Sequence, residues 1–156
     1  KRLVDISRGD EYRQYVTVCA NLGIDIVPAL DRMIAIDYLI GNEDRHLGNF
    51  GLLRNPDTLE YLGPAPVYDC GSSLGYDRMT YDLNADMVLQ CKPFAGSHEQ
   101  QLSLVGDYSW IDEEALSDGL DKVDVFFEEN RKYLGERLEP IRAFLHKRAD
   151  LLLAHL

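Results

Sequence analysis

The segment IDIVPALDRMIAIDYLIGN, residues 24–42, constrains the fold of this chain more than any other. Its apolar residues recur at helical spacing, and they are numerous enough to cover a wide face of the helix. Pro28 suits the first turn of a helix, whereas Gly41 and Asn42 are typical of a helix C-terminus. The sequence therefore predicts a well-buried helix that ends at Gly41 and leads directly into a polar loop.

Shorter patterns flank this helix. Residues 10–22 carry apolar side chains at helical spacing, and Gly23 is expected to stop that helix. Residues 50–62 contain the turn signal NPDT and predict a small β-hairpin. The tripeptide VYD at 67–69 is expected to be a short strand, and residues 71–97 are expected to be irregular.

The rest of the chain is predicted to be helical. SHEQQLSLV begins with Ser97 and has Gln100 three residues later, which is a capping-box pattern. The next segment begins with Ser109, has Asp112 in the matching place, and is expected to form two short helices split near Gly119. The last helix is expected to carry an apolar stripe made of Leu138, Ile141, Leu145, Leu152 and Leu156.

Together these elements predict an α+β fold that is mainly α-helical, with one small β-hairpin after the polar loop. The length of 156 residues favours a single domain over residues 1–156. A hydrophobic content of 46% is sufficient for that domain to bury a core.

Charge and cysteine usage narrow the possible partners and location. There are 27 Asp and Glu against 16 Lys and Arg, a formal charge of −11, which repels nucleic-acid phosphates and anionic membranes. Direct nucleic-acid binding and membrane association are therefore not expected. The three cysteines form no C-x-x-C pair, and the apolar stretches are shorter than the ~20 residues of a membrane span. A cytoplasmic location is expected.

The loop GNEDRHLGNFG, residues 41–51, contains the groups best suited to chemistry. The Asp44 carboxylate can accept a proton from a hydroxyl nucleophile, and the Asn49 amide oxygen can ligate Mg²⁺. Because a hairpin brings the two ends of its stem together, Asp69 in VYDCG is expected to return close to Asn49. The pattern predicts one base and two oxygen ligands that converge on one point.

Each of these residues also has an ordinary structural interpretation. Asp44 could be a solvated carboxylate at the end of a helix, Asn49 a turn residue, and Asp69 a cap for the segment after it. Their order along the chain favours the functional interpretation, because a solvated loop does not require all three.

The residues around them are open to two interpretations. His46 is either a structural residue that steadies the loop or a group that approaches phosphates. Arg45 is expected to form a structural ion pair. Lys92, in the sequence KPF, is expected to be a solvated lysine, with a phosphate contact as the alternative.

The order of Asp44, Asn49, hairpin and Asp69-Cys70-Gly71 resembles that of protein kinases, in which a base, an Asn ligand and a D-F-G aspartate follow in this order. DYLIGNEDRHLGNFGLL followed by PAPVYDCGSSL resembles the C-lobe signature of the HipA-like kinases, bacterial Ser/Thr kinases often found as toxins. This resemblance is strong over residues 30–75. It implies a kinase-like C-terminal lobe that transfers the γ-phosphoryl group of ATP to a hydroxyl.

The resemblance also implies roles for individual residues. Asp44 would be the general base, and His46 would steady the loop or approach the phosphates. Asn49 and Asp69 would bind Mg²⁺ and so the nucleotide. The implied partner is a protein substrate, with an antitoxin or a separate N-terminal lobe as further candidates. In this chain the basic residues follow the base, as Asp44-Arg45-His46, instead of preceding it as in H-R-D.

The nucleotide-clamping parts of a kinase are not visible in the sequence. We find no G-x-G-x-x-G loop and no lysine-bearing strand of the V-A-I-K type. The chain is therefore expected to be a C-terminal lobe that is weakly active or inactive alone. Two alternatives remain: a non-catalytic, pseudokinase-type interaction module, and a metal-dependent phosphohydrolase that uses Asp44, His46 and Asp69.

Overall fold

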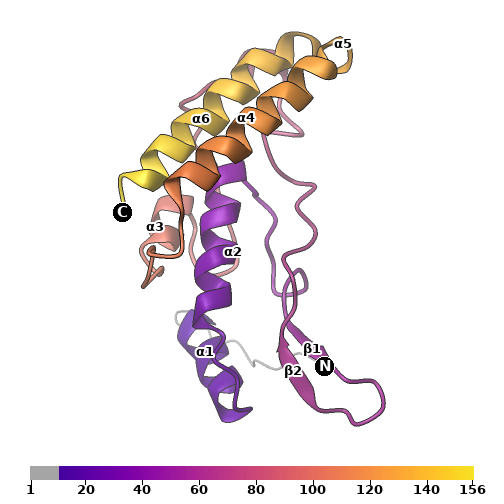
Figure 1. Cartoon of the computed structure of the whole chain (residues 1–156), viewed down its shortest axis with the longest axis vertical. Helices are drawn as coiled ribbons and strands as arrows, with labels where there is room; N and C mark the ends of the chain where they lie inside the picture. Colours follow the sequence, from indigo (N-terminus) through magenta and orange to yellow (C-terminus); the bar gives the residue numbers. More distant parts are fainter. Residues whose placement is uncertain (1–10) are drawn as a thin grey trace.

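The computed structural model describes residues 11–156 and has one central helix, α2, with the other elements arranged around it (Figure 1). Helix α6 and the short helix α3 contact α2, and α4 lies alongside α6. The helices are α1 (Glu11–Asn21), α2 (Val27–Ile40), α3 (His98–Leu102), α4 (Glu113–Glu129), α5 (Arg131–Leu134) and α6 (Leu138–Leu153), with 3-10 turns η1 (Thr80–Asp82) and η2 (Gly135–Arg137).

The predicted buried helix is confirmed in α2. Pro28 lies in its first turn, and its buried residues are Leu30, Asp31, Met33, Ile34, Ala35, Asp37 and Tyr38. Gly41 ends the helix in the left-handed conformation, with φ of 64°. The backbone N–H of Asn42 then donates to the carbonyl of Asp37 at 2.9 Å. The helix end is therefore fixed where the polar loop begins.

The predicted hairpin is also confirmed, which makes the fold α+β, with about half of the chain helical. Strands β1 (Leu52–Arg54) and β2 (Tyr61–Pro64) pair antiparallel, and Asn55 Oδ1 accepts backbone hydrogen bonds in the turn between them. The expected strand at 67–69 is wrong. The carbonyl of Tyr68 accepts a hydrogen bond from the Arg45 side chain, so it is not available to a sheet.

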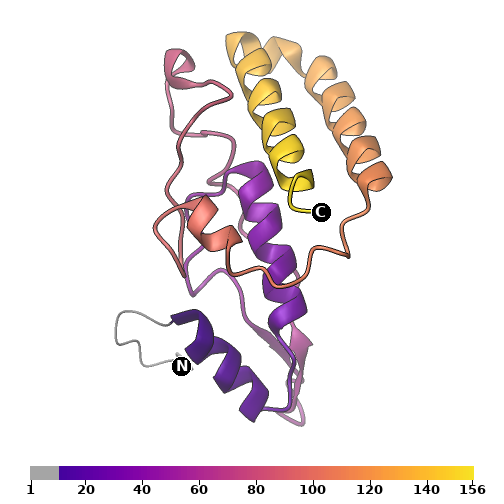
Figure 2. The same ribbon diagram turned by 90° about the vertical axis from the view of Figure 1, so that its left-hand side faces the viewer.

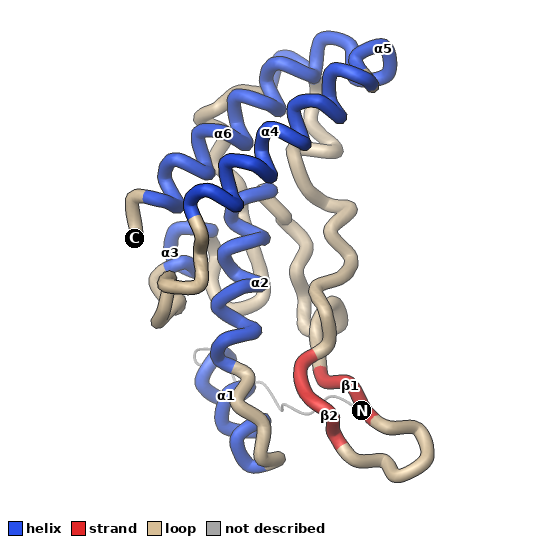
Figure 3. The backbone as a smooth tube through the Cα atoms, viewed as in Figure 1, coloured by secondary structure: helices blue, strands red, loops and turns tan. Residues whose placement is uncertain are grey.

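Residues 71–97 are irregular, as predicted, and run along the helices instead of forming a layer of their own (Figures 2 and 3). The Leu74 N–H donates to the carbonyl of Ile40 at 2.9 Å, and the Arg137 side chain donates to the carbonyl of Gly75 at 2.8 Å. The segment is thus attached to α2 at one point and to η2 at another.

The expected division of residues 109–130 into two helices is wrong, because α4 continues through Gly119. Its N-cap is Asp112, not Ser109, and Asp112 Oδ1 accepts from the Ala115 N–H at 2.9 Å. A glycine inside a helix costs about 1 kcal/mol relative to alanine. The packing of α4 against α6, where Phe127 is buried, offsets that cost. By contrast, the predicted Ser97 cap of α3 is confirmed, since Ser97 Oγ accepts from the backbone N–H of the third helical residue.

Helix α6 joins the two halves of the core. Its residues Leu138, Ile141, Phe144 and Leu145 pack in a cluster with Phe127, whereas Leu152 belongs to a second cluster formed mainly by α1 and α2. Leu156 was expected on the same stripe but follows the helix end and is 58% exposed. None of the helices within residues 11–156 is long and apolar enough to cross a membrane.

Candidate functional site

The polar loop forms a compact turn beside the C-terminal half of α2. The Asp44 N–H donates to Asn42 Oδ1 at 3.2 Å, and the Asn42 side chain in turn donates to Asp37 Oδ1 at 3.0 Å. Further along, the Asn49 N–H donates to the carbonyl of His46 at 2.8 Å. Because Asn42 is fully buried, the loop is attached to the helix from its first residues.

Arg45 anchors the loop to the core. Its side chain is fully buried, its Nε lies 2.8 Å from Asp37 Oδ2, and its Nη2 lies 2.8 Å from Asp37 Oδ1. Burial alone would lower the pKa of the Arg45 guanidinium, but the hydrogen bonds and charge of Asp37 raise this pKa overall. The expected structural ion pair is confirmed, and it is bidentate.

The same guanidinium joins the loop to the segment that follows the hairpin. Nη1 of Arg45 donates to the carbonyl of Asn49 at 2.9 Å and also to the carbonyl of Tyr68, and Nη2 lies 3.2 Å from Cys70 Sγ. Tyr68 returns a bond through its hydroxyl, which donates to the Gly48 carbonyl at 3.0 Å. The chain after the hairpin therefore returns to the loop, as the sequence predicted.

Asp69 stands between two residues held by Arg45. Its side chain is exposed, and its backbone has φ of +56°, in the left-handed region that a residue with a side chain rarely adopts. Such conformations cost roughly 1–3 kcal/mol and persist where the surrounding structure imposes them. Both neighbours of Asp69, Tyr68 and Cys70, are held by contacts with Arg45. No pattern in the sequence indicated this conformation.

Asn49 is buried and lies at the other end of the same arrangement. Its Nδ2 donates to the carbonyl of Asp44 at 3.1 Å, so its Oδ1 is the atom suited to a cation. An amide oxygen and a carboxylate are hard ligands, which fits Mg²⁺ that also binds water and phosphate oxygens. Residues 11–156 contain no group of three or more His, Cys, Asp or Glu able to hold a metal. The metal-binding roles of Asn49 and Asp69 stay predictions.

Asp44 forms an ion pair that the sequence did not predict. Its Oδ1 lies 2.7 Å from Nζ of Lys92, and this hydrogen bond lowers the pKa of the Asp44 carboxyl. Lys92 was expected to be solvated, and its side chain is 57% exposed, but its pairing with Asp44 was not expected. The two residues are 48 positions apart, so no local pattern could pair them.

His46 is exposed and shapes the middle of the loop. Its Nδ1 accepts from the Gly48 N–H at 3.1 Å, and a Cβ at Gly48 would lie only 3.0 Å from His46 Cε1. This contact is consistent with a steadying role, whereas a role toward phosphates stays a prediction. An open pocket of about 400 Å³ is lined by His46, Leu47, Gly48, Lys92 and Pro93, and Lys92 is the ion-pair partner of Asp44.

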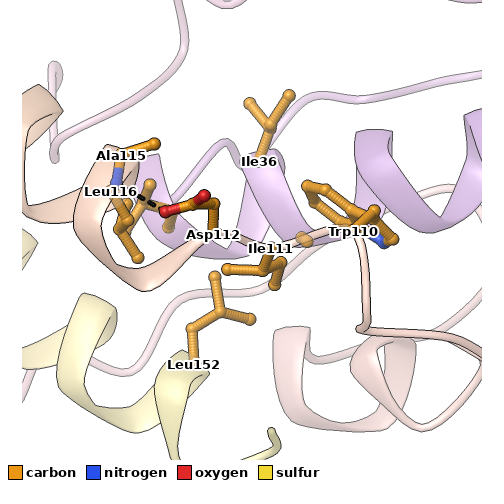
Figure 4. Close-up of a pocket in the computed structure, with 9 residues that line it drawn as sticks. Ile36, Trp110, Ile111, Asp112, Ala115, Leu116 and Leu152 are labelled. Atoms are coloured by element: carbon orange, nitrogen blue, oxygen red, sulfur yellow. Dashed lines mark hydrogen bonds between the residues drawn. The ribbon is translucent and has the colours of Figure 1, made fainter.

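A second pocket, of about 300 Å³, lies between α2, α6 and the N-terminal end of α4 (Figure 4). Its lining is largely apolar and consists of Ala35, Ile36, Leu39, Trp110, Ile111, Asp112, Ala115, Leu116 and Leu152. Asp112 is the charged residue among them, and its carboxylate already caps α4. This pocket therefore offers little to a reacting group, and the polar loop is the better candidate site.

Comparison with known proteins gives a partial match. A segment of 42 residues is 52% identical to the serine/threonine-protein kinase CtkA of Helicobacter pylori (strain J99). It covers 27% of this chain but only 13% of that kinase. No family model matches the chain, and no solved structure matches it. The match supports a kinase-like relationship over part of the chain.

Proposed function

We propose that this chain is the C-terminal catalytic lobe of a HipA-like serine/threonine protein kinase, which transfers the γ-phosphoryl group of ATP to a hydroxyl in the presence of Mg²⁺. One observation carries the proposal. The buried guanidinium of Arg45 bonds the carbonyls of both Asn49 and Tyr68, so the loop with the base and the segment with Asp69 are held side by side. The partial match to a serine/threonine kinase supports the kinase part of the proposal.

In this mechanism Asp44 orients the acceptor hydroxyl and takes its proton as the new oxygen–phosphorus bond forms. The Lys92 hydrogen bond lowers the pKa of the Asp44 carboxyl and so favours the ionised form, which accepts a hydrogen bond from the hydroxyl. Asn49 and Asp69 would hold Mg²⁺, which supplies positive charge to the phosphates. His46 steadies the loop through Gly48 or approaches the phosphates directly.

The kinase hypothesis also implies the partners of this chain. The acceptor is a serine or threonine of a protein substrate, and the nucleotide is clamped by a separate N-terminal lobe. An antitoxin is a further proposed partner. We place the protein in the cytoplasm, where ATP and Mg²⁺ are available and where its three cysteines, all unpaired, stay reduced.

The assignment is tested by Asp44→Asn in the full-length protein that contains this chain. We expect phosphoryl transfer from labelled ATP to fall at least about 100-fold, because general-base catalysis typically contributes that much. Asp57→Asn is the matched control, since Asp57 is exposed in the hairpin turn and should leave the rate unchanged. Transfer at the wild-type rate in Asp44→Asn would contradict the proposal.

One observation favours the alternative of a pseudokinase-type interaction module. The Oδ1 atom of Asp44 is already paired with Lys92. The two functions are separated by calorimetry with Mg²⁺ and ATP on the full-length protein, followed by a transfer assay. The kinase binds nucleotide and consumes it when an acceptor is present, whereas an interaction module does neither.

A further inference from the structure

We infer that Lys92 is a further catalytic residue of this site, whose ammonium group contacts the γ-phosphoryl group during transfer. The inference rests on the proposed kinase function and adds a residue that the kinase pattern of the loop does not contain. Its starting point is the 2.7 Å separation between Lys92 Nζ and Asp44 Oδ1.

The Lys92–Asp44 ion pair contributes little to holding the fold together. The side chains of Lys92 and Asp44 are 57% and 46% exposed, and ion pairs this exposed add little to stability. Exposure also leaves both groups accessible to a ligand in the adjoining pocket, which His46 and Gly48 line from the loop side. Because the Lys92–Asp44 contact adds little to folding and involves the proposed base, we attribute it to the chemistry of the site and not to stability.

The backbone around Lys92 is held firmly by the core. Gln90 and Ser97 form a β-bridge that closes the turn between them. Inside that turn, Cys91 is buried, and the Phe94 N–H donates to Oε1 of Gln101 on α3 at 3.1 Å. Lys92 therefore extends from a turn whose backbone is fixed, and not from a free loop.

An aromatic cluster connects this turn to the candidate catalytic loop. The Phe94 ring lies 5.7 Å from that of Phe50, the residue directly after Asn49, and 5.2 Å from that of Tyr12 on α1. Phe50 also packs edge-on against Tyr15 at 5.1 Å. Edge-to-face pairs of this kind stabilise relative positions. Lys92 and the loop are thus positioned by the same packed rings.

The charge distribution gives Lys92 its chemical role. The chain carries a formal charge of −11, which repels a triphosphate. The positive charge of Arg45 is buried and neutralised by Asp37, so it does not attract a triphosphate to the loop. The acceptor oxygen would lie on Asp44 and the phosphorus within bonding distance of that oxygen. An ammonium 2.7 Å from Asp44 Oδ1 would then lie beside the phosphoryl group.

The step balances without any further reactant. The acceptor oxygen forms a bond to the γ-phosphorus while its proton passes to Asp44. The bond from that phosphorus to the β–γ bridging oxygen breaks, and ADP leaves with the electron pair. Lys92 stays protonated throughout and offsets the negative charge on the transferring group.

The test uses Lys92→Met and Lys92→Arg in the full-length protein. We expect Lys92→Met to lower kcat about 100-fold, the size typical of removing one charge-stabilising group, with a small change in KM for the acceptor. Calorimetry should show weaker binding of Mg²⁺–ATP but nearly unchanged binding of Mg²⁺–ADP, because only ATP has the γ-phosphate. Lys92→Arg should recover part of both. The matched control is Lys122→Met, which removes an exposed lysine on α4.

The outcomes separate this inference from the proposed function. Wild-type protein that binds no Mg²⁺–ATP overturns both. If the wild-type protein transfers phosphate and Lys92→Met has the same kcat and the same affinity for ATP, the role of Lys92 is overturned and the proposed function is not. A merely structural role would lower the melting temperature, weaken ATP and ADP binding equally, and gain nothing from Lys92→Arg; this pattern also overturns the inference. If Lys92→Met does not fold, Lys92→Gln takes its place.

Discussion

The guanidinium of Arg45 and the carboxylate of Asp37 form a fully buried, two-bond ion pair that locks the end of α2 to the loop after it. Because the same guanidinium also bonds the Asn49 and Tyr68 carbonyls, this pair fixes three separate segments at once. The positions of the proposed base and of both proposed ligands depend on it.

Asp37→Asn is expected to destabilise the protein by about 3–5 kcal/mol, because it leaves the Arg45 charge buried without its counter-charge. Urea unfolding followed by circular dichroism measures this change. The control is Arg131→Met, which removes exposed pairs with Glu128 and Glu139 and should shift the unfolding midpoint little. Equal shifts for the two variants would mean that the buried pair does not anchor the loop.

Gly41→Ala is expected to cost about 3 kcal/mol of stability. The φ of Gly41 is +64°, and an added Cβ would lie 2.5 Å from Leu89 Cδ1 and 2.8 Å from Phe144 Cζ. Both the backbone strain and the overpacking disfavour the folded state. Thermal unfolding checks the value. Gly51→Ala, at the other end of the loop, has open space and should have a small effect; the prediction fails if the two variants melt alike.

The parts of the fold that the sequence predicted are those set by local signals. The apolar period of α2 and the left-handed stop at Gly41 are both encoded within one stretch of chain. The turn at Asn55 likewise depends on bonds between near neighbours. For such elements, propensity and tertiary structure agree, so a pattern suffices.

The failures have the opposite cause. Gly119 resembles a helix break, but packing against α6 outweighs its cost. Tyr68 is of a residue type common in strands, yet its carbonyl accepts a hydrogen bond from the Arg45 guanidinium and not from a neighbouring strand. The pairing of Asp44 with Lys92 joins positions 48 residues apart. Each outcome is decided by a partner distant in sequence, which no local pattern contains.

Acidification is expected to destabilise the protein through His98. The side chain is 1% exposed and packs edge-on near Tyr38, and burial, together with the nearby charge of Arg148, lowers its pKa to about 4. The unfolded chain, with a pKa of about 6.5, therefore binds a proton that the folded chain rejects. Stability should fall from pH 6.5 toward pH 4, by on the order of 3 kcal/mol.

His98→Phe should remove this part of the pH dependence while it keeps an aromatic ring beside Tyr38. His155→Phe is the control, because His155 is exposed and stacks on Tyr108 near the C-terminus. Urea midpoints for the three proteins between pH 4 and pH 7 measure the difference. If His98→Phe keeps the wild-type slope, another group must account for the acid sensitivity.

Asp69→Asn is expected to raise the Mg²⁺ concentration needed for half-maximal phosphoryl transfer at least about tenfold, since it removes the one carboxylate of the proposed pair of ligands. A titration of Mg²⁺ at fixed ATP in the full-length protein measures this, with chelator added first to remove metal. The control is Asp77→Asn, which changes an exposed aspartate within the irregular segment 71–97 and should leave the titration unaltered. Because Asp69 is exposed, its loss should not unfold the chain. A wild-type titration in Asp69→Asn would show that the Asp69 carboxylate does not bind the metal.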